Sequence, residues 1–406
     1  MLPCHAFGRF YGPALAALLV LPAAVAGCDK AAPVPPIELT WRPVTLPAAG
    51  GSAQLHELAA CGGRWYAVGA TAPGPPASAA AGQPTRPAAW TTMDGTAWTP
   101  VTLVATRPYG DQGALTSVAC RGADVVAISS ASGGAHGNPR VSTWRSRPDG
   151  AWVQQDAAFE LFGGANAGSV DRVVAGPAGW LIVGHRVSPT TKLRGAAVWR
   201  STDGVAFQLV DDDPALRSAG DTYTTAYDAA PGSTGGWVVV GSAGSATSPV
   251  PAAWTSPDGS TWQRAGVATI GSGAVERAIR YPGWGLLALG RDVGANLAYA
   301  WRAADDAPDT LAELGSTCSG RPDPAGDLLA GLTLADTAAG ASAFAAVGTG
   351  DRSTVCVSGN GASWRALRPP AGLAGDERLR LAGSGRTLLA ATPDHLWIAD
   401  LAGIRP

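Results

Sequence analysis

Residues 254–262 read WTSPDGSTW, and this pattern decides the fold because it recurs along the chain. Residues 90–98 read WTTMDGTAW, and residues 199–207 read WRSTDGVAF. Looser copies begin at residues 144, 301 and 356, so successive copies start about 55 residues apart, with one shorter step. Self-similarity at a fixed period is the signature of a repeat architecture.

A second repeated motif precedes the first and ends in glycine. Residues 63–69 read GRWYAVG, residues 179–184 read GWLIVG, and residues 236–241 read GWVVVG. Counting weaker copies, the motif occurs seven times. Short apolar runs bounded by glycine are typical of strands. Four short antiparallel strands, repeated several times, predict an all-β chain folded as a β-propeller.

The two ends of the chain predict how the ring closes. Residues 394–400 are typical of a third strand, and no full fourth strand follows them. Residues 39–46 read LTWRPVTL and resemble AWTPVTL at residues 97–103, where an outer strand is expected. We therefore expect a seven-bladed propeller with four-stranded antiparallel blades, in which residues 38–46 form the outer strand of the last blade. Such pairing would remove an open sheet edge.

The aspartate-glycine element is similar to the Asp-box, or BNR repeat, of sialidases and many other secreted propellers. It lacks the one residue that separates aspartate from glycine in that repeat. Asp-Gly suits a type I turn followed by glycine at positive φ, and the aspartate can accept hydrogen bonds from the turn. Since every blade needs a hairpin, we assign a structural role to Asp94, Asp149, Asp203, Asp258 and Asn360.

The N-terminal segment has the pattern of an export signal. Residues 12–26 are uncharged and apolar, but too few to span a bilayer as a helix. Residues 25–28 read VAGC, which resembles the lipobox of bacterial lipoproteins and implies lipid on Cys28. The alternative is ordinary secretion with cleavage near Ala26. The expected organisation is a signal peptide at 1–27, a lipidated cysteine with a Pro/Ala-rich tether at 28–37, and the propeller at 38–406.

Four cysteines remain beyond the signal peptide and Cys28. An even number in an oxidising compartment permits two disulfides, in any of three connectivities. Cys61 and Cys120 stand at equivalent points of neighbouring blades, and Cys318 precedes the blade that contains Cys356. We expect the pairs Cys61–Cys120 and Cys318–Cys356.

The net charge, the spacing of potential metal ligands and the absence of known catalytic motifs argue against several classes of function. A formal net charge of −2 argues against nucleic-acid binding, which usually needs a basic stripe. The histidines are scattered and no zinc-ligand spacing occurs, so we expect no metal and no cofactor. The acidic run at residues 211–213 could bind calcium but lacks the EF-hand spacing. A serine-hydrolase elbow is absent.

The best candidate site lies on the expected inner strands, which surround the central channel. Acidic and basic residues are adjacent there in blades three, five and seven, and blade one has His56 beside Glu57. Convergent arginines would suit a carboxylate or phosphate group. The alternative is that these charges satisfy one another across blades. The candidate ligand-binding residues are Arg172, Arg277, Arg378, Glu57, Glu276 and Glu377.

These features predict a monomeric, extracytoplasmic lipoprotein held in the lipid bilayer through Cys28. Its propeller rim would bind an envelope protein or glycan, or act as a scaffold there. The alternative is a sialidase-like glycoside hydrolase. That resemblance implies an arginine triad, a Tyr nucleophile with a Glu partner, and an Asp acid/base. Tyr223 and Tyr227, near Asp221 and Asp228, are suggestive, but no catalytic residue can be assigned.

Overall fold

The computed structural model describes residues 34–406, apart from residues 74–83, 134–138, 269–270, 282, 294–296, 306, 308–309, 318–328, 350–351 and 374–377. Residues 36–406 form one compact unit. The expected signal peptide, Cys28, Cys318 and Glu377 lie outside the described residues. In the part of the chain that is described, no helix has the length and apolar character needed to cross a bilayer.

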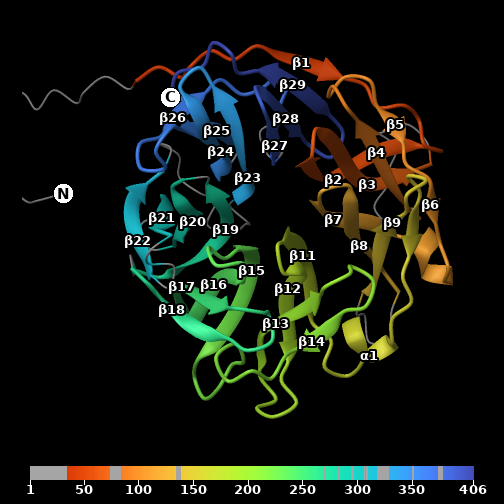
Figure 1. The fold of residues 1–406 in the computed structure, drawn as a ribbon, viewed down its shortest axis with the longest axis vertical. Coiled ribbons are helices and arrows are strands. Elements are labelled where there is room, and N and C mark those ends of the chain that lie inside the picture. Colours follow the sequence, from red (N-terminus) through yellow and green to blue (C-terminus); the bar gives the residue numbers. More distant parts are fainter. Residues whose placement is uncertain are drawn as a thin grey trace, which may run out of the picture. The chain divides into compact units, whose positions relative to one another are not determined.

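The described strands of this unit fall into antiparallel groups of four, which surround a centre (Figure 1). The inner strands are β2 (Ser52–Cys61), β7 (Ala114–Arg121), β11 (Ser169–Gly176), β15 (Tyr223–Pro231), β19 (Gly273–Tyr281), β23 (Leu329–Thr337) and β27 (Arg380–Ser384). The second strands are β3 (Arg64–Ala72), β8 (Asp124–Ala131), β12 (Gly179–Val187), β16 (Trp237–Ser245), β20 (Gly285–Asp292), β24 (Gly340–Thr349) and β28 (Thr387–Ala391).

Third and fourth strands complete each group. The third strands are β4 (Arg86–Thr92), β9 (Arg140–Ser146), β13 (Arg194–Ser201), β17 (Ser248–Ser256), β21 (Leu297–Ala303), β25 (Arg352–Ser358) and β29 (Leu396–Asp400). The short outer strands are β5 (Thr99–Pro100), β10 (Trp152–Gln154), β14 (Gln208–Val210), β18 (Gln263–Val267), β22 (Thr310–Ser316), β26 (Arg365–Leu367) and β1 (Trp41–Val44). The expectation of an all-β propeller with four-stranded antiparallel blades is confirmed.

The groups are not all separate sheets. Strands β18 and β22 pair in parallel through Gly266–Thr310 and Val267–Leu311, which joins two groups into one eight-stranded sheet. The two-residue strand β6 (Leu103–Val104) pairs in parallel with β10 and adds a fifth strand to its sheet. Within the described residues the hydrogen-bonded sheets therefore number six, where seven separate sheets were expected. Such outer-edge pairings cover edges that would otherwise remain open.

The N-terminal strand belongs to the last group. Strand β1 pairs antiparallel with β29, from Trp41 opposite Ala399 to Val44 opposite Leu396, and the two lie side by side at the outside of the ring (Figure 1). The strand is shorter than the expected 38–46. Each inner strand also contacts the next inner strand, and β27 contacts β2, so the circle closes.

Tryptophans from the first motif fill the space between neighbouring groups. Trp90, Trp199, Trp254 and Trp301 are fully buried. Each indole N–H donates to a backbone carbonyl, as Trp199 does to Leu161 at 2.7 Å. Large aromatic side chains bury much apolar area, and a buried indole needs such a partner. The repeated tryptophan thus holds neighbouring groups together.

A β-bulge recurs in the inner strands and turns side chains toward the central cavity. In six of the seven described inner strands the register shifts by one residue, as between Leu55 and Glu57 in β2. A bulge bends the strand and re-aims its side chains. In five of these strands the extra residue faces the central cavity described below: His56, Thr116, Asp171, Tyr227 and Glu276.

The glycine that ends the second motif makes room for this bulge. Gly241 lies opposite Ala226, directly before the bulge in β15. A Cβ atom on Gly241 would collide with the carbonyl oxygen of Thr225. Gly69, Gly184 and Gly290 would meet the inner-strand backbone in the same way. Glycine within a strand marks such a close backbone approach.

One of the two expected disulfides is present among the described residues. Cys61 and Cys120 are joined, with their Cα atoms 6.0 Å apart. The bond links the ends of β2 and β7, the inner strands of neighbouring groups. Cys356 is buried in β25, and its expected partner Cys318 lies outside the described residues.

Candidate functional site

The repeated hairpins between third and fourth strands bind their own backbone. One oxygen of Asp203 accepts hydrogen bonds from the N–H groups of Val205 at 2.8 Å and Ala206 at 3.0 Å. These bonds, first that from Val205, keep the pKa of Asp203 below its usual value. Asp94 and Asn360 each accept two N–H bonds in the same way, and Asp258 accepts one from Ser260.

The hairpin of β9 and β10 is the exception. Its Asp-Gly pair is displaced by one residue, and Asp149 accepts a bond only from the N–H of Ala151, at 3.0 Å, among the described residues. The carboxylates of these hairpins are therefore occupied by the turns that carry them.

The central cavity has a volume of about 540 Å³ and lies among the bulged inner strands. We call it the arginine cavity. It gathers Arg172, Arg277, Arg378, Glu57 and Glu276, which are five of the six residues expected from the sequence. The sixth, Glu377, lies outside the described residues. Its five arginines are Arg172, Arg277, Arg291, Arg378 and Arg380, and the described carboxylates in its lining are Glu57, Asp171 and Glu276.

Arg172 is held between two carboxylates from other blades. Its Nη1 lies 2.7 Å from Glu57 Oε2, and its Nε lies 2.9 Å from Asp228 Oδ1. Burial alone would lower the pKa of Arg172, but the adjacent carboxylates outweigh burial and raise it. Asp228 also accepts the backbone N–H of Ala278 at 3.1 Å. For Arg172, the alternative interpretation of mutual satisfaction across blades therefore holds.

A second ion pair lies at the other side of the lining. Arg291 Nε lies 3.1 Å from Glu276 Oε1, and the Glu276 side chain is only 9 % exposed. This pair joins the end of β20 to the bulge of β19. Glu276 therefore already carries a cationic partner.

The remaining three arginines differ from these two. Among the described residues, Arg277, Arg378 and Arg380 have no carboxylate within ion-pair distance. Two of them donate to backbone carbonyls instead: Arg277 donates to Glu276 at 2.8 Å, and Arg380 donates to His56 and Arg378. Arg277 Nε and Arg378 Nη1 are buried and find no hydrogen-bond acceptor in the described part of the chain.

Burial and neighbouring positive charges disfavour the charged form of two of these arginines. Burial, and then the charge of Arg172, lower the pKa of Arg277. More distant carboxylates offset only part of this lowering: those of Asp228, Glu57 and Glu276. Burial lowers the pKa of Arg380, with further lowering by Arg277 and Arg378. Like charges held this close destabilise one another unless an anion neutralises them. The cavity is therefore suited to receive negative charge.

Neutral groups complete the lining. Burial, then Arg380, lower the pKa of His56, and burial, then Arg194, lower the pKa of His185 to about 4. Both imidazoles are consequently neutral near pH 7. Burial raises the pKa of Tyr227, whose hydroxyl also contacts Ser242.

The sequence singled out Tyr223 and Tyr227 without placing either one, and some other residues of the lining were missed. Tyr223 is 40 % exposed and is not part of the cavity lining, whereas Tyr227 is. Asp228 lies beneath the lining as the partner of Arg172. Arg291 and Arg380 were missed, although Arg380 follows the expected Arg378 by two residues, the spacing of one strand face. In the described residues no cluster of three metal-ligating side chains occurs.

Comparisons with known proteins identify the fold but no family. No family model matches the chain, and no curated protein matches its sequence. A structure of "YCF48 bound to D1 peptide" aligns over 90 % of this chain and 96 % of that one, with 13 % identity and a TM-score of 0.52.

Two further solved structures are less similar. The "Dos1 propeller" aligns over 90 % of this chain and 96 % of its own, with 10 % identity and a TM-score of 0.49. A sialidase of Trypanosoma rangeli in complex with the inhibitor DANA aligns over 88 % of this chain, with 11 % identity and a TM-score of 0.44, and the chain spans 57 % of it. Of the three, the YCF48 structure, with a TM-score above 0.5, supports a propeller fold.

Proposed function

We propose that this protein is an extracytoplasmic binding module, anchored through a lipidated Cys28, whose arginine cavity holds an anionic group of a protein or glycan ligand. The observation that carries the proposal is the set formed by Arg277, Arg378 and Arg380. They are partly buried, repel each other, and have no carboxylate partner among the described residues. Their arrangement differs from that of Arg172, whose charge is already neutralised.

A carboxylate or phosphate fits this set for a chemical reason. Guanidinium groups form paired, charge-assisted hydrogen bonds with planar or tetrahedral oxyanions. Arg277 Nε and Arg378 Nη1 are donors without acceptors, and an unsatisfied buried donor costs about 1–3 kcal/mol. An oxyanion that reaches both donors would remove that cost and the mutual repulsion together.

The rigidity of the ring favours ligand binding in the arginine cavity. We infer that the seven four-stranded groups are the seven blades of one propeller, so that each blade contributes an inner strand to a rigid wall, and six of these described strands are bulged. Binding residues on a rigid scaffold lose little freedom when a ligand arrives. YCF48, whose structure contains a D1 peptide, gives a precedent for a binding propeller.

The binding proposal is tested by calorimetric titration of the full chain with two probes, N-acetylneuraminate as a carboxylated sugar and inorganic phosphate. We expect saturable binding of at least one probe that weakens with added salt. Absence of binding by both at millimolar concentration would contradict the proposal. A glycan array beside a pull-down from envelope extracts separates a glycan ligand from a protein ligand.

The anchor is tested with Cys28→Ala. Acyl chains contribute about 0.8 kcal/mol per buried CH₂, so their loss should release the protein from the membrane fraction. A matched Cys4→Ala variant should stay in the membrane fraction, since Cys4 lies in the expected signal peptide. Unchanged membrane retention of the Cys28→Ala protein would exclude the anchor.

A sialidase-like glycoside hydrolase is the second candidate, favoured by one observation. Tyr227 and Glu276 line the same cavity as the arginines, and the charge of Glu276 influences the pKa of Tyr227. Hydrolysis of a fluorogenic sialoside that Tyr227→Phe abolishes, with the fold intact, would support this function. Absence of turnover by the wild-type protein would remove it.

A further inference from the structure

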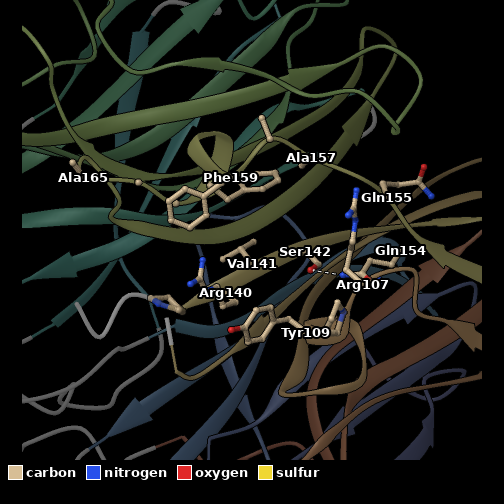
Figure 2. Close-up of a pocket in the computed structure, with 16 residues that line it drawn as sticks. Arg107, Tyr109, Arg140, Val141, Ser142, Gln154, Gln155, Ala157, Phe159 and Ala165 are labelled. Carbon is tan, nitrogen blue, oxygen red and sulfur yellow. Dashed lines mark hydrogen bonds between the residues drawn. The ribbon is translucent and has the colours of Figure 1, made fainter. Parts of the chain in front are cut away.

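A second pocket lies apart from the arginine cavity, and the two share no lining residue. We call it the aromatic pocket. It has a volume of about 540 Å³ and lies between the chain that leads into β7 and the chain that leads into β11. Figure 2 shows Arg140 between the rings of Phe159 and Tyr109.

Arg140 is the centre of this pocket. Its guanidinium carbon lies 4.9 Å from the ring centre of Phe159 and 5.2 Å from that of Tyr109. Its Nε is buried and has no hydrogen-bond partner in the described part of the chain. Aromatic rings attract a cation but accept no strong hydrogen bond from its N–H edge. Arg140, a residue of the pocket lining, therefore keeps a charge-assisted donor without an acceptor among the described residues.

The two rings remain exposed although the fold does not require it. Phe159 is 52 % exposed and Tyr109 is 38 % exposed. The short helix α1 (Phe159–Phe162) is fixed by its other aromatic residue, because Phe162 is buried with its ring 5.7 Å from that of Trp199. Phe159 is thus free to contact a ligand.

The walls of the pocket are preorganised. The side-chain oxygen of Gln154 accepts the N–H groups of Thr106 at 3.0 Å and Arg107 at 2.9 Å, and its amide nitrogen donates to Ser142 at 2.8 Å (Figure 2). On the other wall, Arg186 donates to the carbonyl of Glu160 within α1 and to that of Gly163 directly after it, at 3.2 Å each. A fixed pocket loses little entropy on binding.

The charges of the lining select the ligand. Among the described residues, two arginines and no acidic residue line the pocket. Arg107 is neutralised by Asp156, whose Oδ1 lies 2.8 Å from its Nε. Arg140 has no such carboxylate within ion-pair distance among the described residues. An occupant should bring one carboxylate to Arg140 and an apolar group to the exposed rings.

We propose that the aromatic pocket binds a peptide segment of a partner protein in which an acidic side chain stands beside an aromatic one. The carboxylate would accept the N–H groups of Arg140, and the aromatic side chain would pack against the exposed parts of the Phe159 and Tyr109 rings. A peptide places these two groups on adjacent residues, within the width of such a pocket. The proposal is independent of the arginine cavity, since the pockets have no residue in common.

The test uses short blocked peptides and the full chain. N-acetyl-Asp-Phe-amide should bind in an NMR or calorimetric titration. Its Asn-Phe and Asp-Ala counterparts should each bind about tenfold more weakly, since each lacks one of the two contacts. Failure of the Asp-Phe peptide to bind at millimolar concentration, or equal affinity for all three peptides, would overturn the proposal.

Substitutions in the lining test whether the peptide binds in this pocket. Arg140→Gln and Phe159→Ala should each weaken binding of the Asp-Phe peptide about tenfold. Arg86→Gln is the matched control, because Arg86 is the first residue of β4, as Arg140 is of β9, and does not line the aromatic pocket. Arg277→Gln should leave this peptide's affinity unchanged. Equal losses in Arg86→Gln and Arg140→Gln, or a loss confined to Arg277→Gln, would contradict the proposal.

Discussion

The hairpins and the bulges of this propeller differ in how their side chains vary from blade to blade. The hairpins repeat the same acidic or amide side chain from blade to blade, and each described one binds its own turn. The bulges repeat the same backbone distortion but change side chain each time, from His56 through Asp171 to Glu276. A repeated residue serves a need that every blade has, whereas residues that differ at equivalent positions can build one asymmetric site.

Arg172 is an exception to the division between repeated structural residues and divergent site residues. The side chain at its position differs from blade to blade, yet we expect Arg172 to stabilise the fold. Arg172→Gln leaves Glu57 and Asp228 buried without their cation, which should lower the free energy of unfolding by about 4 kcal/mol. Arg277→Gln is the matched control and should change stability by less than about 0.5 kcal/mol. Urea unfolding measures both. Equal losses would mean that Arg277 is as structural as Arg172.

The glycines that lie opposite four of the six described bulges should prove as important as the hairpins. Gly241→Ala places a Cβ against the carbonyl oxygen of Thr225, and such overpacking should cost roughly 3 kcal/mol. Gly403→Ala is its control, since a Cβ on Gly403 meets nothing within 4 Å. Thermal unfolding compares the two variants. A harmless Gly241→Ala substitution would show that the bulge does not depend on this glycine.

The hairpins should differ according to the bonds that their carboxylates accept. Asp203→Ala removes an acceptor of two N–H groups and should cost about 1 kcal/mol, a modest value because the side chain is largely exposed. Asp149→Ala removes an acceptor of one such bond and should cost less. Urea unfolding at pH 7 ranks the two, and a reversed order would contradict the role assigned to these turns.

The same variant has a defined pH dependence. The pKa of Asp203 is lowered in the folded state, so its contribution is complete above the unfolded value of about 3.9. It should be lost as pH falls through the folded value. The stability difference between wild type and Asp203→Ala should therefore be constant from pH 7 to pH 5 and shrink below about pH 4. A difference that grows on acidification would have the wrong sign.

Much of the fold could be predicted from sequence because its signals are local and repeated. The Trp and Asp-Gly pattern marked the hairpins, and the likeness of residues 39–46 to 97–103 anticipated the pairing of β1 with β29. The parallel contact between β18 and β22 was missed, since two residues of pairing leave no sequence pattern.

The candidate site could be predicted in position but not in detail. Adjacent acidic and basic residues pointed to the inner strands, yet their spacing could not show that Arg172 is neutralised while Arg277 is not. That distinction depends on Asp228, which reaches Arg172 from another blade. The aromatic pocket was missed altogether, because Tyr109, Arg140 and Phe159 meet only through tertiary folding.

The most direct test is a calorimetric titration of both anionic probes, N-acetylneuraminate and inorganic phosphate, with the affinity for a bound probe compared among three proteins: wild type, the Arg277→Gln/Arg378→Gln double variant, and Asp203→Ala. The wild-type protein should bind, the double variant should lose at least about tenfold in affinity while remaining folded, and Asp203→Ala should bind as wild type does. Equal affinity in the double variant and wild type, or a selective loss in Asp203→Ala, would contradict the assignment of binding to the divergent bulge region and of folding to the repeated hairpins.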